Sequence, residues 1–594
     1  MKAWAFGREI LNLLGNLDLL QSKCKKTFYL SITNVTLYSD LNYQYGNYGT
    51  VKLALFFALS MRLPLWLSLI VLVPSVLSSV SQKAIAEPIS IEPVLIGKNQ
   101  TGNGKIAVKQ FDFKGSTVFS QAELAAVTKP YLNKSLSIIE LHEIRNRISK
   151  LYEEKGYVNS GAYIPEQKFE GGKIEIAILE GGLEGIRIGG NKHLRNSYIK
   201  SRLDADEELV NVNDLLTSLQ LLRLDPKIES VSAQLSPGLS PGKSYLDIKV
   251  KETDSFYLTT QLDNNRSPSV GSFQRSIGIN HNSLLGFGDR ANLNYHNTEG
   301  SNAIDLSYAV PLNSKNGTLA FDYGWSDNDV IEEAFNALDI QSKSQLYKLG
   351  FNQPILLKPE REFSLGLDFT HQRAETSLLG ENFPLSRGAD ESGNTNISAL
   401  RFNQNYINRS DEEVLAFRSQ FSLGLDAFDA TINEGDVPDS TFFSWRGQSQ
   451  WVKSLSPDTL FLLRGDVQLA GGSLVPLEQF RAGGAQSVRG YRQDLSLGDN
   501  GLFASAEMRL PIMRFDSFNG VVQLTPFADF ATLWNSGEFE IANSTLPSIG
   551  VGLNFKVADR FNARLDWGIP LSDVDGGDSL QESGVYFSLF SNLF

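Results

Sequence analysis

Apolar and polar residues alternate along the chain from about residue 255 to its end. In residues 304–310, Ile, Leu, Tyr and Val are separated by Asp, Ser and Ala, and residues 561–569 show a similar alternation. Successive side chains of a strand point to opposite faces, so a period of two predicts β-strands. The chain contains about sixteen such segments of about ten residues, the length that a tilted transmembrane strand needs.

A soluble β-sandwich or propeller would show the same alternation, with its apolar face turned toward a core. Two features favour a membrane barrel instead. The polar face carries Arg, Asp and Asn, which suits a water-filled lumen, and aromatic residues recur near strand ends as they do in membrane girdles. We therefore predict a mainly β fold, with a sixteen-stranded transmembrane β-barrel over residues 254–594. The recurring aromatics are Tyr308, Trp325, Trp451, Trp534 and Trp567.

Two short α+β patterns of the same order precede the barrel. Residues 105–181 read as β-α-α-β-β, and both helices begin with a Ser followed three residues later by a Glu, the pattern of a capping box. Residues 182–253 repeat this plan. A tandem repeat of one small unit predicts two similar domains. Residues 87–104 are polar and contain Pro and Gly, which predicts a linker.

The N-terminal region predicts export from the cytoplasm. In residues 61–86, Arg62 is followed by a long apolar run and by the small residues Ala84-Ile85-Ala86, the pattern of a cleaved signal peptide. A transmembrane anchor is the alternative reading of the apolar run. Because Met61 directly precedes the charged residue, we expect it to be the true start and residues 1–60 to be a mis-called extension.

Composition excludes several classes of function. The net charge of −13 argues against a nucleic-acid partner, which requires a basic surface. The one cysteine, Cys24, lies in the predicted extension, so neither a disulfide framework nor a cysteine metal site is expected. The five histidines lack metal-ligand spacing, and no catalytic constellation is apparent. We expect no metal, no cofactor and no enzymatic activity.

The most specific motif lies in the long segment 477–501 between two predicted barrel strands. Its stretch Val488-Arg489-Gly490-Tyr491 resembles the loop tip that enters the lumen of two-partner secretion translocators. These are the outer-membrane proteins of TpsB type, which export hemolysins and filamentous hemagglutinins. The two preceding units then resemble the POTRA domains of that family. The resemblance covers about residues 105 to 594.

The resemblance also implies an acidic partner for Arg489 on the inner wall of the barrel. The family supplies it from a Phe-x-Asp-x-Gly strand motif, which reads Phe527-Ala-Asp529-Phe-Ala531 here. Alternation turns Phe527, Asp529 and Ala531 toward the lumen. The resemblance therefore implies an Arg489–Asp529 pair. Ala531 stands where glycine is usual, and we expect its methyl group to displace the loop slightly.

The last residues form another amphipathic segment. Tyr586, Phe590 and Phe594 share one face, and the final residue is aromatic. This ending resembles the signal by which the barrel-assembly machinery selects outer-membrane proteins. We therefore expect these three residues to act in biogenesis of the barrel.

The resemblance implies a translocator of the cell outer membrane with its POTRA domains in the periplasm. Such a protein captures an unfolded partner exoprotein and secretes it through the barrel pore without ATP. Its other partners would be outer-membrane lipid and the barrel-assembly machinery. The short linker 87–104 does not predict a plug helix, so we expect an open or loop-plugged pore. The alternatives are a barrel-assembly insertase, which usually has more POTRA units, and a passive porin, which would not need them.

Overall fold

The computed structural model describes residues 104–169, 171–203, 207–574 and 577–593. The predicted extension, the signal peptide and residues 87–103 of the linker lie outside these ranges. Among the described residues, no helix is long and apolar enough to cross a membrane.

The first α+β unit has one three-stranded sheet of order β2-β5-β4, in which β2 and β5 are parallel. Both predicted capping boxes are present, because Ser120 and Ser137 each exchange hydrogen bonds with the Glu three residues later. The predicted first strand is broken at Lys109, since Val108 pairs into a separate two-stranded sheet of β1 with β3. The elements are β1 (Ile106–Val108), β2 (Gln110–Lys114), α2 (Gln121–Thr128), η1 (Lys129–Tyr131), β3 (Lys134–Leu136), α3 (Ile138–Glu154), β4 (Gly161–Tyr163) and β5 (Lys173–Leu179).

The second unit repeats this plan without the small extra sheet. Its sheet has the order β6-β8-β7, and its first and last strands are again parallel neighbours. The two helices pack on the sheet through a separate apolar core. The elements are β6 (Gly182–Gly189), α4 (Asn196–Lys200), α5 (Val212–Arg223), β7 (Ile228–Pro237) and β8 (Lys243–Glu252).

A carboxylate at the end of the last strand stabilises the same turn in both units, a feature that the sequence reading missed. Burial alone would raise the pKa of Glu180 and Glu252, but hydrogen bonds to the charged form lower the pKa of both below its ordinary value. This shared device supports two copies of one unit. The donors are the backbone N–H groups of Thr117 and Val118 to Glu180, at 2.8 and 3.0 Å, and those of Lys192, His193 and Leu194 to Glu252, at 2.8, 2.9 and 3.0 Å.

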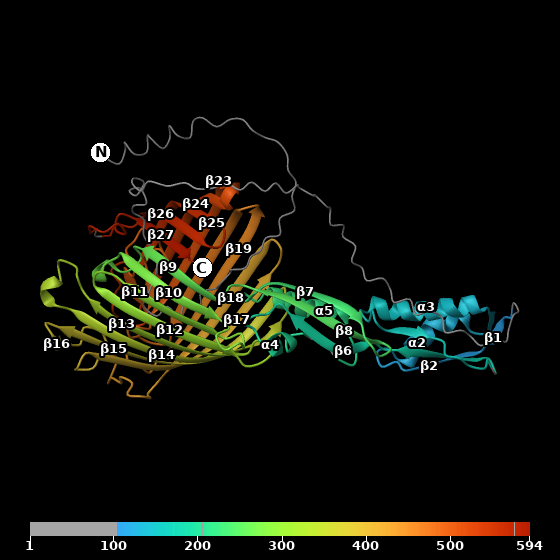
Figure 1. Cartoon of the computed structure of the whole chain (residues 1–594). Coiled ribbons are helices and arrows are strands. Elements are labelled where there is room, and N and C mark those ends of the chain that lie inside the picture. The colour runs from blue at the N-terminus through green and yellow to red at the C-terminus, as the bar shows by residue number, and fades with distance from the viewer. Residues whose placement is uncertain (1–103, 170, 204–206, 575–576, 594) are drawn as a thin grey trace. The chain divides into compact units, whose positions relative to one another are not determined.

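The remaining chain forms a closed antiparallel barrel, which confirms the predicted sixteen long strands (Figure 1). The last strand pairs with the first and closes the cylinder. The two-residue strand β16 (Glu381–Asn382) and the short helices η2 (Pro268–Val270), η3 (Asn336–Leu338) and η4 (Asp516–Phe518) lie in connections. The long strands are β9 (Phe256–Asp263), β10 (Gln274–Asn282), β11 (Arg290–Asn297), β12 (Ser301–Pro311), β13 (Thr318–Asp329), β14 (Gln341–Leu357), β15 (Arg361–Leu378), β17 (Asn394–Arg409), β18 (Glu413–Leu425), β19 (Phe443–Ser456), β20 (Thr459–Ala470), β23 (Asn500–Phe515), β24 (Gly520–Trp534), β25 (Thr545–Val557), β26 (Phe561–Pro570) and β27 (Val585–Asn592).

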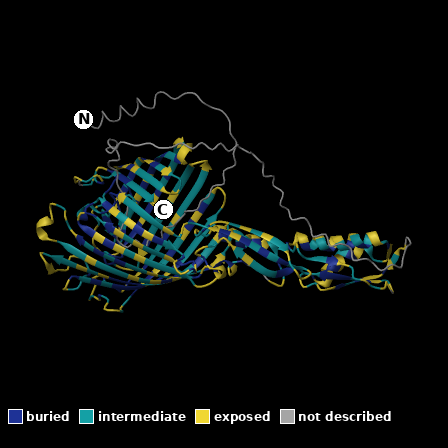
Figure 2. Cartoon of the chain, in the orientation of Figure 1, coloured by how far each residue is buried: buried dark blue, intermediate teal, exposed yellow. Residues whose placement is uncertain are grey.

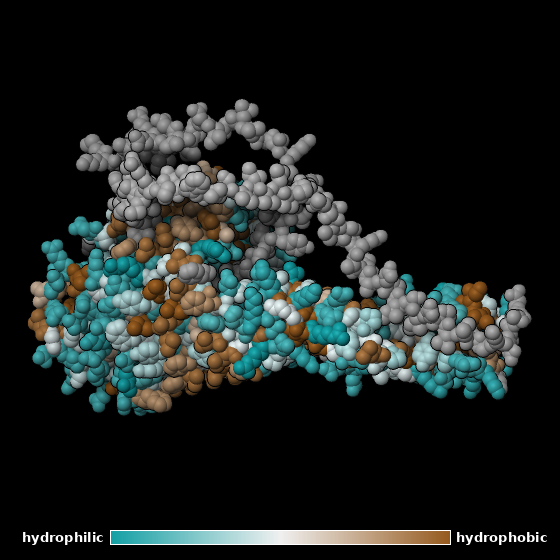
Figure 3. All heavy atoms as spheres, in the orientation of Figure 1, coloured by the Kyte–Doolittle hydropathy of each residue, from teal (hydrophilic) through white to brown (hydrophobic). Residues whose placement is uncertain are grey.

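The two faces of the barrel wall differ as the alternation predicts. Leu367, Leu423 and Trp567 are each about half exposed, whereas Gln468 and Asp529 are buried inside. Figure 2 shows exposed and buried positions alternating along the strands, and Figure 3 shows apolar residues gathered over the barrel strands. An apolar outer face with a polar interior is the arrangement of a transmembrane barrel.

Candidate functional site

The barrel interior holds the connection between β20 and β23, which we call the lumen loop (residues 471–499). The lumen loop starts at the rim opposite to the one where β9 begins and β27 ends, because an odd number of long strands precedes it. Its stem is the hairpin of β21 (Phe480–Ala482) and β22 (Ser496–Gly498), and residues 483–495 form its tip. The predicted loop 477–501 therefore extends two residues into β23.

Glycine lets the tip lie directly on the barrel wall. Gly490 has a φ of +104°, and a Cβ there would lie 3.1–3.3 Å from the backbone of Gly568 to Pro570 on β26. The opposing Gly568 is equally constrained, because its Cβ would lie 2.5 Å from the Gly490 nitrogen. The Gly490 N–H also donates to the hydroxyl of Tyr586, at 3.1 Å. A side chain larger than hydrogen at either glycine would separate tip and wall.

Arg489 projects from this tip into a buried acidic site. Its Nε donates to Asp529 Oδ2 at 2.7 Å, and its Nη2 donates to Asp529 Oδ1 at 2.9 Å. The backbone N–H of Arg489 donates to the same carboxylate at 3.2 Å. The guanidinium carbon lies 3.4 Å from the ring centroid of Phe527, so the aromatic ring supports the cation from one face. The structure thus brings Arg489 together with both Phe527 and Asp529.

Further charged residues join this pair, and the sequence reading missed them. Arg489 Nη1 donates to Glu507 on β23 at 2.7 Å, and its distance to Asp566 on β26 is 3.9 Å. Arg564 of β26 contacts both of these carboxylates at 2.6 Å. We call these five residues, Arg489, Glu507, Asp529, Arg564 and Asp566, the Arg489 cluster. Each cation lies between anions, and Arg509 adds a third cation at 2.9 Å from Glu507, so the charges compensate one another.

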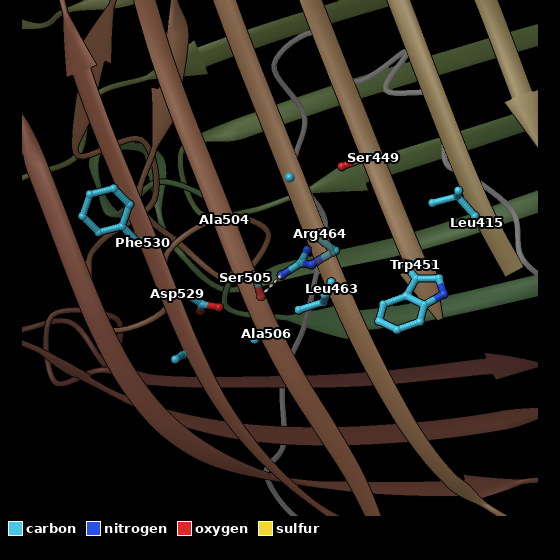
Figure 4. A pocket seen from close by; sticks show the side chains of 12 residues that line it. Leu415, Ser449, Trp451, Leu463, Arg464, Ala504, Ser505, Ala506, Asp529 and Phe530 are labelled. Atoms are coloured by element: carbon cyan, nitrogen blue, oxygen red, sulfur yellow. Dashed lines mark hydrogen bonds between the residues drawn. The ribbon is translucent and has the colours of Figure 1, made fainter. Parts of the chain in front are cut away.

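The side of the cluster near β20 is shown in Figure 4. Arg464 donates to Ser505 at 3.3 Å and to the backbone carbonyl of Gln486 in the tip at 3.0 Å. Asp529 lies on β24, next to the strand that carries Ser505, in the same view. On the outer face, Gly465, Ala504 and other small residues leave a depression of about 480 Å³ in this part of the wall. Arg464 thus connects the tip to β20, in addition to β23, β24 and β26.

Tyr491 and Val488 complete the contact of the predicted motif. The Tyr491 hydroxyl donates to the Pro547 carbonyl at 2.6 Å, and Val488 is fully buried. The methyl group of Ala531 packs in the same apolar cluster as these two residues. Arg489 reaches Asp529 with this methyl group in place.

One of the three predicted C-terminal signal residues contacts the lumen loop. Tyr586 is 2 % exposed, and its hydroxyl donates to the backbone carbonyl of Tyr491 inside the barrel. It is therefore part of the wall that receives the tip. Phe590 is half-buried in β27, whereas Phe594 lies outside the described residues. Sequence alternation assigned Tyr586 to a shared face, but it contained no information on what that face contacts.

Comparison with known proteins identifies the family. Residues 242–555, more than half of the chain, match the family of the haemolysin secretion/activation protein ShlB/FhaC/HecB, and residues 106–181 match the POTRA domain of ShlB type. The chain belongs to this family. The family consists of outer-membrane transporters rather than known enzymes. The barrel therefore lies in the outer membrane and the POTRA-type units lie in the periplasm, which puts the start of the lumen loop at the extracellular rim.

Individual relatives support the same assignment. The outer membrane transporter CdiB of Dickeya dadantii is 21 % identical over 481 residues, which cover 78 % of this chain and 83 % of CdiB. The heme/hemopexin transporter protein HuxB of Haemophilus influenzae is 24 % identical over 494 residues, covering 77 % and 82 %. The solved structure of CdiB from Escherichia coli has the same fold, with a TM-score of 0.63, 21 % identity and coverage of 85 % and 94 %.

Proposed function

We propose that this protein secretes one unfolded exoprotein through its barrel and that the Arg489 cluster is the latch that keeps the lumen loop inside the pore. The observation that carries the proposal is the position of Arg489, which is 1 % exposed and reaches carboxylates on β23 and β24. A passive porin has no need for such a neutralised, buried attachment of a loop. Release of the tip would widen the path for an extended chain.

The two periplasmic units, with proposed bounds 105–181 and 182–253, would capture the client before it enters the barrel 254–594. Each three-stranded sheet ends in edge strands, and β7 is a ten-residue edge strand. An extended client segment can add to such an edge, where main-chain hydrogen bonds give affinity and side-chain pockets give selectivity. Addition to a sheet edge suits an unfolded client, because its exposed backbone groups form the hydrogen bonds.

Secretion would proceed without ATP. The sequence contains no G-x-x-x-x-G-K-[ST] loop for nucleotide phosphates. Folding of the client outside the cell would prevent its return and so give direction to the transport. We also infer that the aromatic C-terminal residues Tyr586, Phe590 and Phe594 serve the barrel-assembly machinery, and that Tyr586 in addition serves the loop contact.

A comparison of culture supernatant and outer-membrane proteins, with and without the gene, tests the proposal. We expect the loss of one or a few large secreted proteins and an unchanged set of outer-membrane proteins. A broad loss of barrel proteins would identify an insertase instead. For the capture step, full-length protein should retain the unfolded client identified in this way and should not retain the same client after folding.

A further inference from the structure

We propose that Arg401 and Glu478 form a second attachment point, which holds the stem of the lumen loop when the tip is released. This inference rests on the proposed function, because it defines which part of the loop moves. Arg401 lies on β17, and Glu478 lies in the loop just before β21. Both act as positioning residues: they determine where the loop stays, and no contact with a client is required of them.

The pair is a bidentate and buried ion pair. Arg401 Nη2 donates to Glu478 Oε1 at 2.6 Å, and Nη1 donates to Oε2 at 3.0 Å. The side chains are 5 % and 4 % exposed. Two parallel charge-assisted hydrogen bonds fix both distance and orientation, which a single contact would not do.

Each partner is held in place by its own surroundings. Arg401 also donates to Thr370 on β15 at 3.3 Å and to Ser422 on β18 at 3.0 Å. The backbone carbonyl of Glu478 accepts from Gln468 on β20 at 2.9 Å. Four strands therefore contribute to this one attachment. Such a site restrains the stem without help from the tip.

An apolar cluster lies beside the ion pair. It joins residues of the loop just before Glu478 to β17 and to the segment before β19. Several of these side chains are fully buried, so water is excluded from this end of the stem. The members are Ile397, Ala399, Phe442, Leu474, Val475 and Leu477.

The second leg of the stem is tied to the first. The carboxylate of Asp499 accepts from the backbone N–H of Leu474 at 2.9 Å, from the Gln479 side chain at 3.0 Å and from the backbone N–H of Ser536 at 2.9 Å. Together with the β21–β22 hairpin, these bonds hold both legs at the extracellular end. The tip is joined to this stem through Gly483 and Gly484, whose φ values are +109° and +95°.

The two attachment points lie on different parts of the wall and have opposite polarity. The tip presents a cation to acidic residues on β23, β24 and β26, whereas the stem presents an anion to a cation on β17. Three strands, β18, β19 and β20, separate β17 from β23 in the barrel order. Loss of the Arg489 contacts therefore frees residues 483–495 and leaves the stem fixed, so the tip moves as a tethered flap.

Spin labels on the full-length protein in liposomes test this inference. One nitroxide replaces Gln486, an exposed residue of the tip, and another replaces Leu497 in β22 of the stem. We expect Arg489→Ala to shift the tip label from an immobile to a mobile spectrum and to leave the stem label unchanged. We expect Glu478→Gln to mobilise the stem label. If Arg489→Ala mobilises both labels, or Glu478→Gln mobilises neither, the inference is wrong.

The double variant Arg401→Gln/Glu478→Gln separates attachment from misfolding. It removes both charges of the pair, so neither partner is left charged opposite a neutral one, and the stem label should still be mobile if the ion pair holds the stem. Recovery of an immobile stem in this variant would overturn the inference. Secretion is measured separately in cells. If the unmodified protein exports no client, the proposed function fails, whereas the label spectra still decide whether the second attachment exists.

Discussion

Replacement of Arg489 by alanine should release the tip of the lumen loop. The free-energy cost of this change arises mainly at Asp529, whose side chain is fully buried. Of its hydrogen bonds to residue 489, this carboxylate would keep only the one from the backbone N–H. Glu507 and Asp566 retain Arg564 as a partner. Breaking a buried ion pair by removing one partner costs about 3–5 kcal/mol. If the tip leaves the wall and water reaches Asp529, most of this cost is avoided. The ratio of open to closed protein should therefore rise by roughly a hundred- to a thousandfold.

Single-channel conductance in planar lipid bilayers measures this shift. The Arg489→Ala protein should show frequent and long openings where the unmodified protein is mostly closed. The matched control is Arg492→Ala in the same tip, because Arg492 pairs with Glu332 and Glu582 but its side chain is 25 % exposed. These contacts are partly exposed and are not bidentate, so this variant should change opening much less than Arg489→Ala does. Equal conductance of both variants and the unmodified protein would refute the latch.

Three further predictions follow from the local contacts. Gly568→Ala should also open the channel, because the added Cβ would lie 2.5 Å from the Gly490 nitrogen. Gly472→Ala should not, because a Cβ there meets open space. Single-channel conductance distinguishes the two variants. Phe527→Leu should raise the open probability by roughly thirtyfold, since a desolvated cation–π contact contributes about 2 kcal/mol; a change below twofold would exclude that role. Glu180→Gln should lower the melting temperature of the first periplasmic unit at neutral pH, measured by differential scanning calorimetry. Because the folded-state pKa of Glu180 is depressed, its contribution to folding stability is present above the ordinary pKa of a glutamate and is lost as the pH falls through the folded value. A difference in melting temperature between variant and unmodified protein that persists at the lowest pH would contradict this prediction.

The sequence predicts local features of this fold well, because they depend on neighbours along the chain. Alternation determines which strand residues face the lumen, and the Ser–Glu spacing at Ser120 and Ser137 locates two helix starts. The motif around Arg489 and its resemblance to a family predicted the contact with Asp529. Glu507 and Asp566 were missed because they come from strands that are separated along the chain and come together only in the folded barrel. Same-face charges two residues apart, as in Arg564 and Asp566, are a signal that would have pointed to them.

The energetics of the Arg489 cluster fit the proposed release of the lumen loop. Burying five charged groups has a large desolvation cost, and their mutual attraction offsets it only while all partners are in place. In the proposed mechanism, a hydrated client chain that entered the lumen would bring water to Glu507 and Asp529. Water would then solvate these carboxylates, and the free-energy advantage of keeping Arg489 in its site would fall. An apolar contact of the same size would become stronger in water, so it could not be released in this way. The buried ion pairs therefore combine a well-defined closed position with sensitivity to what enters the pore.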